Sequence, residues 1–325
     1  MDSWLDGDPA WAAIREERLI VRGHPVRVLR CDAASGGDDP QLLVHGLGGS
    51  AGNWVEVMAP LAELGPVVAV DLPGFGGTPV PDGGSARVTA NAAFVAAVAR
   101  ALGWSRFTLH GNSMGGLIAT LVAAEHPDLV DRLVLVSPAL PPDRPTALLP
   151  LPRATAIGVL PMALPVVGRP LVELALTRMQ AAGDRVEAEQ FLELLFTDPE
   201  VVRPELRRAL AGESAVAAAR PPADRATALA TASRSLAAMF LDPRRAMRAI
   251  DAVTAPTLVL GGEEDRLIAR RVLARAASRR SDWTTRIEPA TGHVMMLEHP
   301  RRYVDHVIEW REWTDARRED LSRAS

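Results

Sequence analysis

Three side chains that could act together in covalent catalysis lie far apart in the sequence, each shortly after a segment expected to form a strand. Ser113 stands between Gly111 and Gly115 in the segment GNSMG. Serine at its ordinary pKa is a poor nucleophile and needs a neighbouring base. His293, which follows a glycine, could take the proton, and Asp265, in the segment GGEED, could orient the imidazole. These residue types predict nucleophilic chemistry on a serine hydroxyl.

The sequence around Ser113 is typical of a sharp turn between a strand and a helix. Residues 107–110 are expected to form a short buried strand, and apolar residues recur at helical spacing over residues 117–122. Gly111 and Gly115 fit such a turn because a Cβ at either position would collide with neighbouring backbone. A serine held there presents its hydroxyl clear of the sheet. The context therefore favours Ser113 as the nucleophile.

The composition is that of an ordinary globular chain. It has 325 residues, 48% of them hydrophobic and 23% charged, with a net charge of −4. This charge argues against a nucleic-acid partner or binding to an anionic membrane. The single cysteine, Cys31, cannot form an internal disulfide, which favours a reducing compartment. With no signal-peptide pattern and no apolar run long enough for a transmembrane segment, we expect a cytoplasmic protein.

Apolar runs and amphipathic segments alternate along most of the chain. The expected strands are a hairpin within residues 17–31 and the runs 41–44, 67–70, 107–110, 133–136, 257–260 and 283–287. Strands that alternate with helices indicate a parallel sheet covered by helices on both faces. In such a sheet, sites form at the carboxyl ends of strands. Ser113, Asp265 and His293 all follow strands in this way.

This alternation stops after residue 138. Nine prolines within residues 138–170 are too many for a regular helix or a central strand. The helical stretches that follow are residues 186–197, 205–219 and 225–241. We therefore expect a helical cap at residues 139–252, inserted between core segments 1–138 and 253–325. The apolar stretch 154–167 fits either the core of this cap or a surface that meets an apolar substrate or a lipid interface. The polar residues 314–325 are expected to fray.

Five motifs in this order resemble those of the α/β-hydrolase fold superfamily, which includes serine esterases and lipases. They are HGLGG at residues 45–49, DLPGFG at 71–76, GNSMGG at 111–116, GEED at 262–265 and GH at 292–293. The order serine, acid, histidine is also the order of the triad in that family. The resemblance covers nearly all of the chain. It implies an α/β fold with a mostly parallel eight-stranded sheet, flanking helices, and a helical cap after the sixth strand.

The resemblance also implies a role for each of five residues. Ser113 is the nucleophile, His293 the general base and Asp265 the acid that orients and stabilises the imidazolium. The backbone N–H groups of Leu47 and Met114 form the oxyanion hole, which stabilises the charge of the tetrahedral intermediate. This chemistry requires no metal and no organic cofactor.

Several residues are alternatives to these. Ser50 repeats the motif in GGSAG, but its glycines belong to the loop that supplies Leu47, so a nucleophile there would leave Ser113 without a role. For the acid, the alternatives are Glu263, Glu264 and Asp143; some relatives place the acid just past the sixth strand, as at Asp143. The remaining histidines are expected to be structural: His24, His45, His110, His126, His299 and His306.

The first functional hypothesis is hydrolysis of a carboxylic ester of an apolar small or medium substrate through an acyl-enzyme on Ser113. The expected cap is rich in Ala, Leu, Val, Pro and Met and contains no Trp, which suggests an apolar ligand. GNSMGG also resembles the elbow of meta-cleavage-product hydrolases, which cleave carbon–carbon bonds, yet Val294 stands where those relatives carry Trp. A cofactor-free perhydrolase, an acyltransferase and a non-catalytic small-ligand binding protein are further alternatives. The natural substrate and the oligomeric state stay open.

Overall fold

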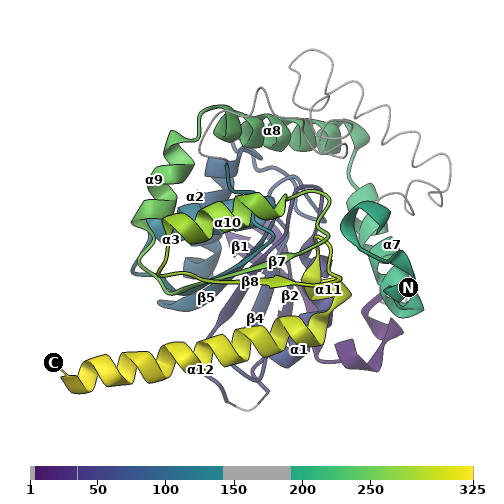
Figure 1. Cartoon of the computed structure of the whole chain (residues 1–325). Helices are drawn as coiled ribbons and strands as arrows, with labels where there is room; N and C mark the ends of the chain where they lie inside the picture. Colours follow the sequence, from purple (N-terminus) through teal and green to yellow (C-terminus); the bar gives the residue numbers. More distant parts are fainter. Residues whose placement is uncertain (1–3, 35, 142–191, 325) are drawn as a thin grey trace.

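The computed structural model describes residues 4–34, 36–141 and 192–324, and an eight-stranded sheet lies at its centre (Figure 1). The strands lie side by side in the order β1-β2-β4-β3-β5-β6-β7-β8. In chain order they are β1 (Ile14–Val21), β2 (His24–Cys31), β3 (Gln41–Val44), β4 (Val67–Val70), β5 (Phe107–Asn112), β6 (Val130–Val136), β7 (Thr257–Gly262) and β8 (Thr284–Glu288). β2 runs antiparallel to both β1 and β4, and every other neighbouring pair is parallel. The predicted, mostly parallel sheet is confirmed.

The turn between β1 and β2 is tighter than the sequence suggests. The pairing of Val21 with His24 leaves only Arg22 and Gly23 in the turn. Both have positive φ, 51° and 82°. This is the two-residue turn whose twist matches that of antiparallel strands. Both strands therefore extend further than their apolar residues alone indicate.

Helices cover both faces of the sheet. The described α-helices are α1 (Val55–Leu61), α2 (Val88–Ala101), α3 (Met114–Glu125), α7 (Pro204–Ala218), α8 (Pro222–Leu241), α9 (Arg244–Ala252), α10 (Arg270–Arg279), α11 (Met295–Glu298) and α12 (Pro300–Ala324). Short 3-10 helices are η1 (Trp4–Gly7), η2 (Pro9–Trp11), η3 (Ala51–Trp54) and η5 (Pro199–Val201). Side chains of α2, α3, α9 and α10 belong to one buried cluster, and those of α1, α11 and α12 belong to another.

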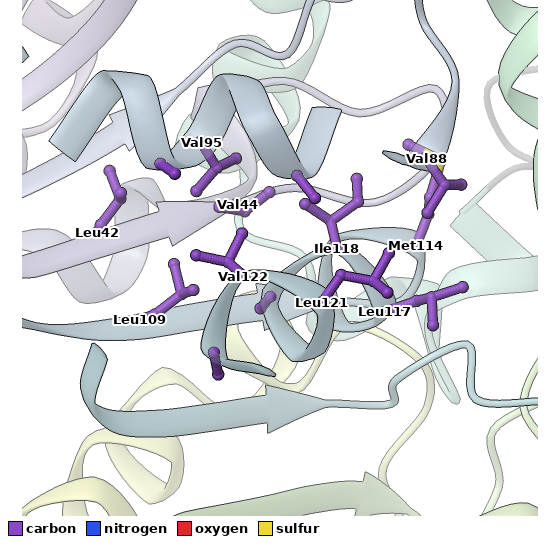
Figure 2. Close-up of a cluster of buried hydrophobic side chains, with 14 of the residues drawn as sticks. Leu42, Val44, Val88, Val95, Leu109, Met114, Leu117, Ile118, Leu121 and Val122 are labelled. Carbon is purple, nitrogen blue, oxygen red and sulfur yellow. The ribbon is translucent and has the colours of Figure 1, made fainter. Parts of the chain in front are cut away.

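Alternate residues of each central strand enter these two clusters. Leu42 and Val44 of β3 pack on one face with α2 and α3, as Figure 2 shows for Val95 and Ile118. Leu43, between them, faces the other cluster. All three strand residues are fully buried. This explains the continuous apolar runs, because a parallel strand covered on both faces has no side exposed to water.

The segment between β6 and β7 is helical in the part that the structure describes. Its helices α7 and α8 match the predicted stretches 205–219 and 225–241, while α9 was not predicted as a separate helix. In Figure 1, α8 crosses above the sheet. Its Ala228 would be only 2.4 Å from a Cβ placed on Gly74, in the loop after β4. The proline-rich part, the apolar stretch 154–167 and the first residues of the stretch 186–197 lie outside the described residues.

The N-terminal residues contact α7 and the residue just before it. η1 lies beside α7 (Figure 1), and a Cβ on Gly212 of α7 would come within 2.7 Å of the Trp4 side chain. Just before α7, Arg203 forms ion pairs with Asp8 at 2.6 Å and with Glu56 at 2.7 Å. This part of the insertion therefore contacts both the N-terminal segment and the core.

The expectation that the chain frays from residue 314 is wrong, because α12 continues to Ala324. Thr314 is buried, Arg132 forms an ion pair with Asp315, and Arg318 forms one with Asp131 at 2.9 Å. Contacts with β6 thus stabilise the end of a helix whose sequence is polar. Across the described residues, no helix is both long enough and apolar enough to cross a membrane.

Candidate active site

Ser113 lies between β5 and α3 in a strained backbone conformation. Its φ is 54° and its ψ is −118°, a region that non-glycine residues rarely adopt. Its N–H donates to the carbonyl of Val136 at 3.0 Å, and its own carbonyl accepts from Gly116 at 3.0 Å. Such strain persists only where surrounding contacts impose it, and it is concentrated at functional sites. The geometry is that of a nucleophile elbow.

The glycines around Ser113 are required by close backbone contacts. A Cβ on Gly111 would lie 2.4 Å from the carbonyl oxygen of Gly115. A Cβ on Gly115 would lie 2.4 Å from the carbonyl oxygen of Val44. A Cβ on Gly46 would lie 3.1 Å from the Cβ of Ser113. The loop after β3 therefore reaches the serine, and Leu47 is the next residue in that loop.

The imidazole of His293 is hydrogen-bonded to the carboxylate of Asp265. Nδ1 and Oδ2 are 2.9 Å apart, and both side chains are buried. Burial opposes the charge of Asp265, but His293 and the N–H of Ile268 outweigh it, so the pKa of Asp265 is lowered. An ionised Asp265 accepts the proton on Nδ1, which leaves Nε2 of the neutral ring as the nitrogen able to take another proton. Leu267 and Ile268 donate to the other carboxylate oxygen.

Asn112, directly before Ser113, connects the serine to the histidine. Its side-chain Nδ2 donates to the backbone carbonyls of His293 and Val136, each at 3.2 Å. Asn112 is buried. Sequence reasoning gave this residue no role of its own, although its place beside the serine was a signal. The hydrogen bonds bring the loop of His293 to the elbow.

Ser50, in the second copy of the serine motif, is in a different environment. Its φ of −150° and ψ of 176° are ordinary extended backbone at the start of η3. Its hydroxyl donates to Glu213 of α7. Glu213 also forms an ion pair with the buried Arg27 at 2.5 Å, and Arg27 contacts Asp71 at 3.0 Å. Ser50 therefore belongs to a buried charged cluster, and it lacks the strained elbow of Ser113.

Two other buried histidines have both ring nitrogens engaged. His45 contacts the carbonyl of Gly46 at 2.7 Å and accepts from the N–H of Leu72 at 3.0 Å. Burial lowers the pKa of His45. His110 contacts Tyr303 at 2.5 Å and Gln41 at 2.7 Å, and burial lowers its pKa to about 3. Both are neutral structural groups in this geometry.

The remaining alternatives are placed as follows. His306 pairs with Glu288 and His299 with the carbonyl of Ala290, while His126 ends α3 and His24 begins β2. Glu263 forms an exposed ion pair with Arg270, and the backbone N–H of Glu264 donates to Thr291. Asp143 lies outside the described residues. Among the residues that the structure describes, no group of three or more His, Cys, Asp or Glu side chains could hold a metal ion.

Known proteins share sequence similarity with this chain. The family model of the alpha/beta hydrolase fold matches residues 40–300. An esterase of Mycobacterium tuberculosis, Rv0045c, is 40% identical over 144 residues, which are 42% of this chain and 48% of the esterase. Human 1-acylglycerol-3-phosphate O-acyltransferase ABHD5 is 31% identical over 134 residues, which are 40% of this chain and 38% of that protein. The chain thus matches less than half of the length of these relatives.

A solved structure has a similar fold over a larger share of the chain. It is a membrane phospholipase A described as a bacterial virulence factor, with 26% identity and a TM-score of 0.64. The comparison covers 93% of this chain and 86% of the phospholipase. With the family model, the sheet and the elbow in agreement, the chain belongs to the alpha/beta hydrolase fold family.

Proposed function

We propose that this protein is a serine hydrolase that cleaves carboxylic esters of apolar small or medium substrates through an acyl-enzyme on Ser113. One set of contacts carries the proposal. Ser113 has the strained elbow backbone, Asn112 beside it holds the carbonyl of His293, and the ring of His293 is bonded to Asp265 at 2.9 Å. The esterase named among the relatives supports the same reaction class.

In this mechanism the hydroxyl of Ser113 attacks the ester carbonyl carbon while Nε2 of His293 takes its proton. The tetrahedral intermediate then loses the alcohol, which leaves with the proton from Nε2, and the acyl group stays on Ser113. Water attacks the acyl-enzyme with His293 again as base, and the carboxylic acid is released. Asp265 stays ionised throughout and stabilises the imidazolium that forms in each half of the reaction.

The oxyanion of each intermediate is assigned to the backbone N–H groups of Leu47 and Met114. Two observations support this assignment. Met114 is the first residue of α3, whose N-terminus carries a partial positive charge. Leu47 follows Gly46, on which a Cβ would lie 3.1 Å from the Cβ of Ser113. Loss of one such donor typically costs about 3–4 kcal/mol of barrier.

We assign substrate selection to the cap, residues 139–252, between the core segments 1–138 and 253–325. α8 of this insertion packs against the loop after β4, near the carboxyl edge where Ser113 lies. The apolar composition of the insertion supports an apolar acyl or alcohol group. The same acyl-enzyme could also pass its acyl group to an alcohol, and the acyltransferase among the relatives favours this second candidate.

The test uses the purified protein with p-nitrophenyl esters of graded acyl length, beside the variants Ser113→Ala and Ser50→Ala. We expect the parent to hydrolyse these esters. Ser113→Ala should reduce the rate to background, and the folded fraction of Ser50→Ala should keep the parental rate. Added alcohol that becomes acylated would identify a transferase. Fast cleavage of a vinylogous diketone with slow ester cleavage would identify a carbon–carbon hydrolase. Ligand binding without any turnover would contradict the enzyme hypothesis.

A further inference from the structure

Glu298, the last residue of α11, binds two segments of the chain, and the farther one is 101 positions from it in the sequence. Its Oε2 accepts a hydrogen bond from the N–H of Gly292 at 2.6 Å. Its Oε1 accepts one from the N–H of Thr197 at 2.7 Å. Glu298 is only 8% exposed. A buried carboxylate thus has each oxygen bound to a different segment, one beside His293 and one in the insertion.

The same two segments also contact each other directly. The N–H of His293 donates to the carbonyl of Leu195 at 2.7 Å. A Cβ on Gly292 would lie 2.5 Å from that same carbonyl oxygen, so the two backbones touch. Residues 195–197 of the insertion therefore lie against the backbone of the proposed base, and Glu298 binds both sides of this contact.

Three polar groups of His293 each have a separate partner. Its N–H is held by Leu195, its carbonyl by Asn112 and its Nδ1 by Asp265. Two of these partners belong to the core, and the third belongs to the insertion. Any movement of residues 195–197 would consequently act on the backbone of His293.

We propose that Glu298 is a positioning residue that links residues 195–197 of the insertion to the loop of His293. Through this link, the position of the insertion affects the orientation of the His293 imidazole. This inference rests on the proposed function, in which His293 is the base. A carboxylate suits the role because it accepts two short, charge-assisted hydrogen bonds from N–H groups. Glutamine would offer one acceptor and would turn an NH₂ group toward the other N–H. That N–H would stay buried without an acceptor, at a substantial desolvation cost.

The experiment compares the full chain with Glu298→Gln, and with Glu288→Gln as a matched control. Glu288 is also largely buried, but its carboxylate binds the side chain of His306 and no catalytic loop. The measurements are the rate at which a fluorophosphonate labels Ser113, kcat and KM for p-nitrophenyl acetate, and the melting temperature. Labelling requires the base but no natural substrate, so it reports on the orientation of His293.

We expect Glu298→Gln to lower the labelling rate and kcat together by about 10- to 100-fold, the usual effect of a misplaced catalytic group. KM for the small acetate should change less than about twofold, since uniform substrate binding is not altered. Glu288→Gln should label at the parental rate. A purely structural role would lower the melting temperature of Glu298→Gln and leave the labelling rate of its folded fraction unchanged, which would overturn the proposal.

A second pair of variants keeps the test decisive if Glu298→Gln does not fold. Thr197→Pro removes the backbone N–H that donates a hydrogen bond to Glu298, and Thr197→Ala retains this N–H. We expect slower labelling for the proline variant alone. Equal labelling of the two would overturn the coupling. If the parent is neither labelled nor able to hydrolyse esters, the proposed function and this inference are both overturned. If the parent is active and the Glu298 and Thr197 variants are labelled at the parental rate, only the inference is overturned.

Discussion

The side-chain amide of Asn112 donates a hydrogen bond to the backbone carbonyl of His293 at 3.2 Å, so the residue beside the proposed nucleophile also binds the loop of the proposed base. Asn112→Asp should disrupt this link more than Asn112→Ala, because a carboxylate would face two carbonyl oxygens, those of His293 and Val136. We expect kcat for ester hydrolysis to fall by about 10- to 100-fold in Asn112→Asp. Steady-state kinetics on the folded variants checks this. A smaller loss in Asn112→Asp than in Asn112→Ala would contradict it.

Asp265→Asn tests the orientation of the imidazole. The amide could donate to Nδ1, which would place the ring proton on Nε2 and leave no nitrogen to accept the proton of Ser113. The equivalent change in a serine protease lowers kcat about 10⁴-fold, and we expect a loss of similar order here. Glu264→Gln, two positions from the strand end, is the control and should retain the parental kcat. A loss of less than about tenfold in Asp265→Asn would assign the acid elsewhere.

His110 should make the stability of the fold depend on pH. Burial lowers its pKa from 6.5 to about 3, so between these values the unfolded chain binds a proton that the folded chain does not. The stabilisation is complete above about pH 6.5 and is lost as the pH falls toward 3. The contribution of this residue approaches about 1.4 kcal/mol per pH unit within that window.

His110→Gln removes this titration and leaves that of His45, which has the same direction. Urea unfolding at about pH 7 and about pH 4.5 measures the free energy of unfolding of both proteins. We expect the parent to lose more stability on acidification than the variant. Equal losses would mean that His110 is protonated in the folded protein.

Arg27 and Arg15 offer a matched comparison of buried and exposed ion pairs on one hairpin. Burial opposes the charge of Arg27, but Asp71 and Glu213 outweigh it and raise its pKa. Arg27→Met would leave both carboxylates buried without their partner, which should lower the free energy of unfolding by about 3–5 kcal/mol. Arg15→Met removes two pairs that are exposed to water, with Glu17 and Asp32, and should cost less than about 1 kcal/mol. Chemical denaturation of the two variants measures their free energies of unfolding. Similar losses of stability in both variants would contradict the prediction that burial makes the Arg27 ion pairs more important.

The parts of the molecule with local signals were predictable from the sequence. The β5–α3 unit was predicted because glycines stand where a Cβ would collide and because the helix has regular apolar spacing. The central strands β3 and β4 were predicted because two covered faces require continuous apolar runs. The end of α12 was predicted wrongly, since its stability comes from ion pairs with β6 that a polar segment does not reveal.

The supporting contacts of the site could not be predicted in the same way. Arg27 meets Glu213 across 186 positions, and Glu298 meets Thr197 across 101. In the sequence, the charged side chains of Arg27, Glu213 and Glu298 cannot be distinguished from charges on the protein surface, although all three are buried in the fold. For the second copy of the serine motif, the sequence context favoured Ser113, but the contact of Ser50 with Glu213 could not be predicted from it.

The positive φ of Ser113 lowers the stability of the fold, while the proposed chemistry requires a serine at this position. A glycine at this position would adopt the same angle without steric penalty, and strain of this kind is worth about 1–3 kcal/mol. Selection for heat resistance alone would therefore tend to replace the hydroxyl on which the proposed reaction depends. A thermostabilised library screened without a turnover assay should be checked at this codon first.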